Sequence, residues 1–447
     1  MTTIIDGPSV RHALRANRIA SAWAASGICD DYVVYERDQH WSFAGGRRIS
    51  IVLTAAEVIV DNGRERRSTS WTGSPARQLE SVIATRVPSS ARLVGWVGFD
   101  FCAAEFGLLG HIPRSQVLAH LIVPEFEAVV TPTGVTIDGA DARTEAILRA
   151  IAETADVPVP SDDTCVGVDL DRGAGRYRDV VSRAVDEIRA GRYRKVVLAR
   201  QVEIPVDVDI PATYRRGRAA NTPARSFLLR LDGLEAAGFS PELVAAVRAD
   251  RTVVAEPLAG TRAFGVSEDL DRRARAELET DMKEIAEHAL SVQTAFDEVA
   301  AVAAQGTTAV TDFMRVRERG SVQHLGSTVT GTLSERLGPW DALAALFPSI
   351  TASGTPKRAA VDAIYRYEGR PRGLYSGAVV TVTPAGDFEA TLALRTVFRQ
   401  NGRCWLQAGA GIVEQSEPER EFRETCEKLG SVAPYLVPHR PPAERTA

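Results

Sequence analysis

Apolar and polar positions alternate over short stretches throughout the chain, which is the pattern of half-buried strands. The turn pairs Asn62-Gly63 and Thr133-Gly134 favour antiparallel hairpins between such stretches. The strands are predicted at residues 30–37, 48–63, 91–101, 126–139, 195–206, 226–231, 243–249, 252–260, 321–333, 375–384, 388–400 and 404–413. Because hairpin-like turns join several of these strands, the pattern indicates an α+β protein with mainly antiparallel sheets.

Apolar residues at steps of three and four predict four helices, at 141–154, from Tyr177 to a stop near Gly191, at 282–299, and close to the C-terminus. In the third helix, Glu284 and Glu287 lie off the apolar stripe. Glu421 and Glu424 share one face of the last helix. These four carboxylates can meet only if the two helices converge.

Prolines and acidic residues interrupt any period at 157–169, which predicts a linker. We therefore expect an N-terminal, mainly β subdomain at 1–170, a larger region at 171–436 and a polar tail at 437–447. The two large parts are expected to pack as one fused structural domain.

Composition and charge narrow the function classes. The 53 basic and 58 acidic side chains give a net charge of −5, without the basic stripe typical of a nucleic-acid binder. The five cysteines never form a C-x-x-C pair, as expected for a reduced cytoplasmic protein. The sequence contains no apolar run of about 18 residues, so no membrane span is predicted. No export signal is recognised either. We expect a cytoplasmic protein that binds neither nucleic acid nor membrane.

The acidic pairs have two interpretations. Asp281-x-x-Glu284 and Ser416-x-x-Glu419 match capping boxes, and Glu424 with Lys428 is a favourable helical ion pair. Alternatively, the carboxylates form an oxygen-ligand site for Mg²⁺. The residues alone leave both interpretations open.

Other segments carry weaker signals. AGAGIVEQ at 408–415 lacks the third glycine of a dinucleotide-binding loop, although Gly409 and Gly411 would let a ligand approach the backbone. His324 lies in a strand pattern, where a buried structural histidine is the ordinary outcome. Nucleophile-elbow, Walker A and zincin signatures are absent.

Taken together and in order, these and further segments resemble the chorismate-utilising enzymes, which include isochorismate, salicylate, anthranilate and aminodeoxychorismate synthases. The resemblance spans nearly all of residues 175–435, and it is closest to salicylate synthases of the mycobactin type. The segments are GRYRKVVLAR, GFSPELV, AEPLAGTR, KEIAEHALSV, SVQHLGSTV, FPSITASGTPK, RGLYSGAVV, LALRTVF and AGAGIVEQSEPEREFRETCEKL.

The resemblance implies a fold of two large, mainly antiparallel β-sheets flanked by helices, with the active site in a central cleft. It also implies conversion of chorismate through isochorismate to salicylate and pyruvate, with Mg²⁺, for siderophore biosynthesis. Lys195 resembles the lysine that activates water in this branch, and Ala259 stands where aminodeoxychorismate synthases carry lysine.

Site residues follow from the resemblance, residue by residue. Lys195 is expected to be the base, Glu242 the acid, and His324 a group that shapes the lyase step. Burial of Glu242 is expected to favour its protonated form. The expected substrate-binding residues are Gly260, Thr261, Tyr375, Arg395, Gly409, Gly411 and Lys428, and the expected Mg²⁺ ligands are Glu287 and Glu424, assisted by Glu284 and Glu421.

Three alternatives stay open at this point. The chain could be an isochorismate synthase that releases its product, an anthranilate-type synthase that uses ammonia, or a non-catalytic chorismate-binding relative. For the preferred function we expect a monomer that acts on chorismate and isochorismate and requires no glutaminase partner.

Overall fold

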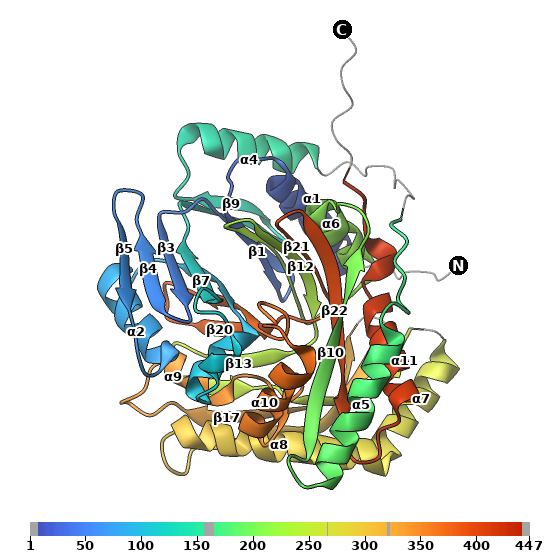
Figure 1. Ribbon diagram of the computed structural model, residues 1–447. Helices are drawn as coiled ribbons and strands as arrows, with labels where there is room; N and C mark the ends of the chain where they lie inside the picture. Colours follow the sequence, from blue (N-terminus) through green and yellow to red (C-terminus); the bar gives the residue numbers. More distant parts are fainter. Residues whose placement is uncertain (1–7, 156–164, 266, 320–321, 440–447) are drawn as a thin grey trace.

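The computed structural model describes residues 8–155, 165–265, 267–319 and 322–439, and its strands form two large sheets (Figure 1). The paired strands run antiparallel, as the hairpin signals predict. The expected fold class, two antiparallel sheets flanked by helices, is confirmed.

The first sheet contains strands from both parts of the chain. In spatial order they are β18 (Gly354–Thr355), β10 (Lys195–Ile204), β22 (Arg403–Ile412), β21 (Thr396–Gln400), β12 (Leu234–Ser240), β11 (Arg225–Leu231), β1 (Tyr32–Arg37), β2 (His40–Gly45), β8 (Phe126–Thr131) and β9 (Gly134–Asp138).

The second sheet mixes the two parts in the same way. Its order is β15 (Leu258–Ala263), β17 (Val322–Thr332), β14 (Thr252–Ala255), β13 (Leu243–Val247), β20 (Phe388–Leu392), β19 (Ala378–Val382), β6 (Leu93–Val97), β7 (Val117–Val123), β3 (Ile49–Thr54), β4 (Glu57–Asp61) and β5 (Arg66–Ser70), with β16 (Ala309–Arg319) paired to β17.

The two sheets pack against each other through one apolar cluster, to which β1 contributes Val33 and Tyr35 and β19 contributes Val379. The alternate residues Tyr32 and Val34 point the other way, into a cluster shared with helices. Because side chains alternate across a strand, a run that is apolar at every position is buried on both faces. This explains why β1 carries no polar face until its end.

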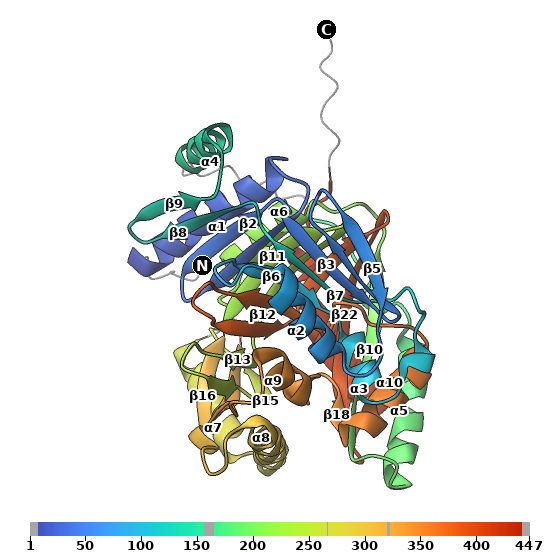
Figure 2. The same cartoon turned by 90° about the vertical axis from the view of Figure 1, so that its left-hand side faces the viewer.

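Helices cover the outer faces of the two sheets (Figures 1 and 2). α1, α4 and α6 share the apolar cluster of the first sheet, whereas α2, α8, α9 and α10 share that of the second. The helices are α1 (Pro8–Ala25), α2 (Pro75–Arg86), α3 (Cys102–Glu105), α4 (Ala142–Thr154), α5 (Ala174–Arg189), α6 (Ile210–Ala220), α7 (Glu268–Thr280), α8 (Met282–Val302), α9 (Pro339–Leu346), α10 (Lys357–Glu368) and α11 (Pro418–Gly430), with short 3-10 turns at Phe99–Phe101, Leu109–His111 and Ala433–Tyr435.

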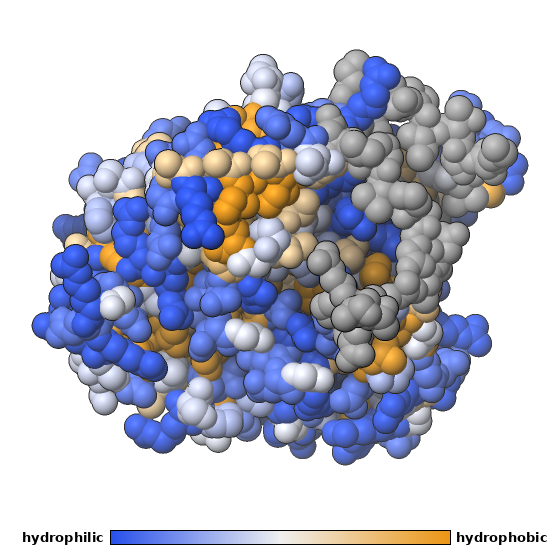
Figure 3. Space-filling model, turned by 90° about the horizontal axis from the view of Figure 1, so that it is seen from above, coloured by the Kyte–Doolittle hydropathy of each residue, from blue (hydrophilic) through white to orange (hydrophobic). Residues whose placement is uncertain are grey.

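Seen from above, hydrophilic residues dominate this face, and apolar residues gather in one hollow near its centre (Figure 3). In the described part of the chain, no helix combines the length and apolar character that crossing a membrane requires.

Four predicted strands are each two strands in the structure. The run 48–63 divides into β3 and β4, 126–139 divides into β8 and β9, and 252–260 divides between β14 and β15. The run 388–400 divides into β20 and β21, because the chain crosses from the second sheet to the first. Arg395, at this crossing, has a left-handed backbone with φ 50°. An apolar pattern continues through such a crossing, so periodicity alone could not reveal it.

The predicted boundary near residue 170 is not a break in either sheet. β1 pairs with β11, and β6 pairs with β19, so strands from before and after the boundary are hydrogen-bonded neighbours. Residues 157–164 of the predicted linker and 440–447 of the predicted tail lie outside the described residues. At 437–439 the chain is attached to the body, since the His439 N–H donates to the carbonyl of Asp207.

Candidate active site

Lys195 begins β10, where it is half-buried and lies opposite Thr355 of β18. Its Nζ is 3.5 Å from Oε2 of Glu287 on α8. The lysine side chain passes over Gly411 of the neighbouring strand β22, where an added Cβ would lie 2.9 Å from its Cε. The absent side chain at Gly411 therefore makes room for Lys195, and three predicted site residues meet here.

Glu242 lies between β12 and β13, where its side chain is only 3% exposed. The Ser349 hydroxyl donates to Oε1 at 2.8 Å. Burial raises the pKa of Glu242 to about 8; the Ser349 and Thr351 hydroxyls oppose this shift, and nearby Glu256 adds to it. The predicted upward shift is confirmed, and at neutral pH most of this carboxyl carries a proton.

Lys195 and Glu242 are within electrostatic reach of each other. The ammonium of Lys195 acts on the Glu242 carboxyl in the direction that lowers the pKa of the latter. The two groups come from different strands, β10 and the β12–β13 connection. A potential base and a potential acid therefore lie in one part of the molecule.

The first turn of α8 holds Glu284 beside Arg262 of β15, with Nη1 3.2 Å from Oε1. The Glu284 N–H donates to Asp281, so the predicted capping role of Asp281 is confirmed. Gly260 has φ 67°, and an added Cβ would lie 3.0 Å from Oε2 of Glu284. Gly260 and Glu284 thus lie together, while the side chain of Thr261 lies outside the described part of the structure.

Helix α11 carries the second carboxylate pair. Glu421 is buried, and Glu424 accepts from Lys428 at 2.7 Å, as the helical spacing predicts. Nζ of Lys428 also donates to the carbonyl of Gly409 at 2.9 Å, which ties the helix to β22. The predicted capping box at Ser416 is wrong: Glu417 is the N-cap, and the Ser416 hydroxyl instead accepts from the N–H of Val413.

The four predicted metal ligands have the right donor chemistry, because Mg²⁺ prefers carboxylate oxygens. The two pairs border neighbouring strands, since Glu287 contacts Lys195 of β10 and Glu424 is linked through Lys428 to β22. Yet within the described ranges no three acidic, histidine or cysteine side chains are grouped closely enough to hold a metal ion. Glu284, Glu287 and Glu424 each contact a basic side chain instead.

Arg395 and Tyr375 are candidates for binding an anion. Burial alone lowers the pKa of Arg395 to about 10, and its guanidinium forms no hydrogen bond or ion pair with any residue that the structure describes. A partly buried cation without a partner among the described residues is costly, so an anionic ligand would stabilise it. Tyr375 is buried as well, which raises its pKa to about 12.

His324 lies buried in β17, with Nδ1 3.1 Å from the carbonyl of Gly260. This contact places His324 beside β15, the strand whose Arg262 contacts Glu284. On the other side of the site, an added Cβ at Gly409 would lie 2.8 Å from the carbonyl of Leu198 in β10, so only glycine allows this close strand pairing.

Sequence reasoning missed two residues next to the acid. Ser349 and Glu256 lie in the segments FPSITASGTPK and AEPLAGTR, which contribute to the family resemblance without either residue being expected in the site. A serine or glutamate in a loop carries no periodic signal, and only the fold reveals that both lie beside Glu242.

Comparison with known proteins gives a consistent result. Residues 31–434 match the model of the family described as chorismate binding enzyme. The chain is 48% identical over 409 residues to salicylate synthase of Mycolicibacterium paratuberculosis, covering 91% of this chain and 90% of that protein. It is 33% identical over 362 residues to anthranilate synthase component 1 of Geobacillus stearothermophilus, covering 79% of this chain and 70% of that protein.

Solved structures share the fold. Anthranilate synthase component I of Streptococcus pneumoniae superposes with a TM-score of 0.73 at 26% identity, covering 88% of this chain and 92% of that chain. The menaquinone-specific isochorismate synthase of Escherichia coli has a TM-score of 0.71 at 21% identity, covering 93% of this chain and 91% of that chain.

Proposed function

This chain belongs to the family of chorismate-binding enzymes, and from that premise we propose that it is a Mg²⁺-dependent salicylate synthase that supplies siderophore biosynthesis. The observation that supports the proposal is that Lys195 lies within electrostatic reach of Glu242, a buried carboxyl that accepts a hydrogen bond from Ser349 and has a raised pKa. Water addition with loss of a hydroxyl requires a base and an acid in one site.

In the first reaction, water adds to C2 of chorismate while the hydroxyl at C4 leaves. Nζ of Lys195 takes a proton from the attacking water as the new C–O bond forms. The ring double bond shifts, the C4–O bond breaks, and Glu242 gives its proton to the leaving oxygen, which departs as water. One water enters and one leaves, so the product, isochorismate, is an isomer of chorismate.

Substrate binding follows from the two carboxylates of chorismate. We assign the enolpyruvyl carboxylate to Arg395 and Tyr375, with backbone N–H groups near Gly409 and Gly411 close by. Arg395 supports this assignment because its guanidinium has no partner among the described residues. The ring carboxylate would lie toward Gly260 and Thr261.

Glu287 and Glu424 would hold Mg²⁺, with Glu284 and Glu421 in support, and Lys428 would border the ligand. When bound, the ion supplies positive charge that neutralises the ring carboxylate and orients it. The contacts of Glu287 with Lys195 and of Glu424 with Lys428 would have to loosen as the ion enters.

In the second reaction, isochorismate loses pyruvate by a pericyclic hydrogen transfer, which requires positioning more than a base. His324 is proposed to shape the pocket for this step, because its ring is fixed against the carbonyl of Gly260. A cytoplasmic location, a monomeric state and independence of a glutaminase remain predictions from the sequence.

The test is to incubate the protein with chorismate and Mg²⁺, without ammonia, and to separate the products chromatographically. We expect equimolar salicylate and pyruvate, both lost with EDTA and in Lys195→Ala. Arg194→Ala, which removes the exposed neighbouring cation, is the matched control and should retain activity. Isochorismate that accumulates without pyruvate would instead identify an isochorismate synthase.

A further inference from the structure

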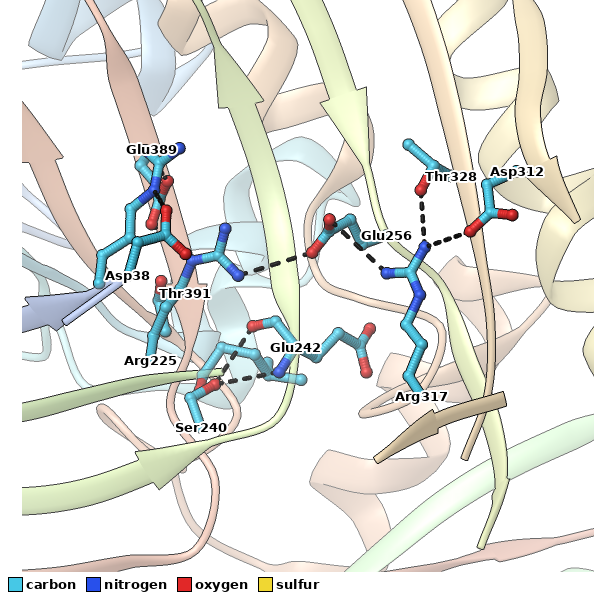
Figure 4. A network of polar contacts seen from close by, with 12 residues as sticks. Asp38, Arg225, Ser240, Glu242, Glu256, Asp312, Arg317, Thr328, Glu389 and Thr391 are labelled. Carbon is cyan, nitrogen blue, oxygen red and sulfur yellow. Dashed lines mark hydrogen bonds and ion pairs between the residues drawn. The ribbon is translucent and has the colours of Figure 1, made fainter. Parts of the chain in front are cut away.

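Glu256 lies between two arginines, directly beside the acid of the site (Figure 4). It follows β14, and its carboxylate is 25% exposed. Its Oε2 is 3.5 Å from Nη1 of Arg225 on β11, and its Oε1 is 3.6 Å from Nη1 of Arg317 on β16. One carboxylate therefore bridges two cations from different strands, one in each sheet.

Each arginine has a second acidic partner further from the site. Nε of Arg225 donates to Glu389 at 2.6 Å, and Nη2 of Arg317 donates to Asp312 at 3.3 Å. These five residues form a row of alternating charge, which we call the ion-pair row. Glu256 is its central member and the one that both arginines share.

The position of Glu256 matters because Glu242 can act as an acid only while it keeps its proton. The charged groups that act on this carboxyl are Lys195 from β10 and Glu256 from the segment after β14, besides the hydroxyls of Ser349 and Thr351. Burial has the largest effect on the pKa of Glu242, the two hydroxyls lower it, and the negative charge of Glu256 raises it further. An unbalanced guanidinium in the same place would have the opposite effect.

We propose that Glu256 is a positioning residue for the acid step: it neutralises Arg225 and Arg317 and so keeps the proton on Glu242 at working pH. This inference rests on the proposed function and adds a residue that acts through Glu242 without touching the substrate. The bridge also fixes the segment after β14 against β11 and β16, which holds that negative charge at a constant distance from the acid.

The test compares kcat against pH in the parent, Glu256→Gln and Arg317→Gln. Rates of an enzyme with a protonated acid fall as pH rises through the pKa of that acid. In Glu256→Gln this alkaline limb should move to lower pH, with rates at pH 6 within about twofold of the parent. In Arg317→Gln the limb should move to higher pH, because Glu256 then has one cation fewer to offset its charge.

The double variant Glu256→Gln/Arg317→Gln removes one charge of each sign and should bring the limb back toward that of the parent. Glu127→Gln is the matched control: its ion pair with Arg92 is similarly half-buried but lies on β8, so the limb should stay in place. If Glu256→Gln does not fold, the opposite shift in Arg317→Gln still tests the charge effect. Shifts of the same sign in the two single variants, or none in either, overturn the proposal.

A second measurement separates this inference from the proposed reaction. The C=O stretching band of protonated Glu242, isolated as the difference between the parent and Glu242→Gln infrared spectra, can be followed against pH without substrate or Mg²⁺. It should lose intensity at lower pH in Glu256→Gln than in the parent. If the parent forms no salicylate but the band shifts, the proposed function fails, while the charge effect of Glu256 on Glu242 stands.

Discussion

Two regions of the site use the same functional group in opposite ways. Glu242 lies at the sheet layer, almost fully buried, with a hydroxyl as its hydrogen-bond donor. Glu284, Glu287 and Glu424 lie on helices, and each contacts a basic side chain. The buried carboxyl, which has no contacting cation, has a raised pKa, whereas the three carboxylates on the helices are each held by a basic side chain.

The largest effect is expected from removing the acid, Glu242. Glu242→Gln keeps the shape and the hydrogen bond to Ser349 but has no proton to transfer. We expect kcat to fall by about 10²–10⁴-fold, with little change in KM, because general acid catalysis contributes on that scale. Steady-state salicylate formation measures it.

Glu235→Gln serves as the control for this change, since Glu235 is on the preceding strand and pairs with Arg399 away from the acid. Its rate should match that of the parent. If Glu242→Gln retained near-parental kcat, the assignment of the acid would be wrong.

The sequence predicts the carboxylates on the helices better than it predicts the buried acid. The carboxylate pairs on α8 and α11 follow from helical spacing, and the pair Glu424–Lys428 forms as predicted. The role of Glu242 came only from resemblance, because nothing local distinguishes S-P-E from an exposed loop. Its hydrogen-bond donor, Ser349, is far away in the chain, and such contacts leave no periodic pattern in the sequence.

The fold, too, is predicted from the sequence only in part. Strands such as β1, β10 and β22 are evident from apolar β-branched runs, and the antiparallel class follows from the hairpins. Their order in the two sheets is not evident, because neighbours such as β19 and β6 are distant in sequence. The crossing at Arg395 was hidden for a related reason: its apolar flanks enter two different sheets.

The role of the carboxylates on the helices can be tested through metal binding. Glu287→Gln should weaken Mg²⁺ binding on the order of tenfold or more, since even residues that only orient a metal ligand cost about 10–100-fold. Titration calorimetry with Mg²⁺ alone gives the affinity. Glu427→Gln, an exposed carboxylate on α11, is the matched control. Equal affinities in these two variants and the parent would remove Glu287 from the proposed metal site.

The smallest effect concerns the hydroxyl at the acid. The Ser349 hydrogen bond lowers the pKa of Glu242, so Ser349→Ala should raise it further and move the alkaline limb of kcat to higher pH. We expect a shift of roughly half a pH unit and a rate at neutral pH within a few-fold of the parent. Ser349→Thr, which keeps the hydroxyl, should return the limb toward its parental position. A shift to lower pH in Ser349→Ala would contradict this account of the acid.

The pairing of early with late strands has a consequence for how the chain folds during synthesis. β1 and β6 leave the ribosome long before their partners β11 and β19, so each waits with an open edge. At about 5–20 residues per second, β19 follows β6 only after tens of seconds. An open edge is a template for pairing with other chains. The N-terminal third is therefore expected to need protection by chaperones until the last strands arrive, and a fragment ending near residue 170 should aggregate.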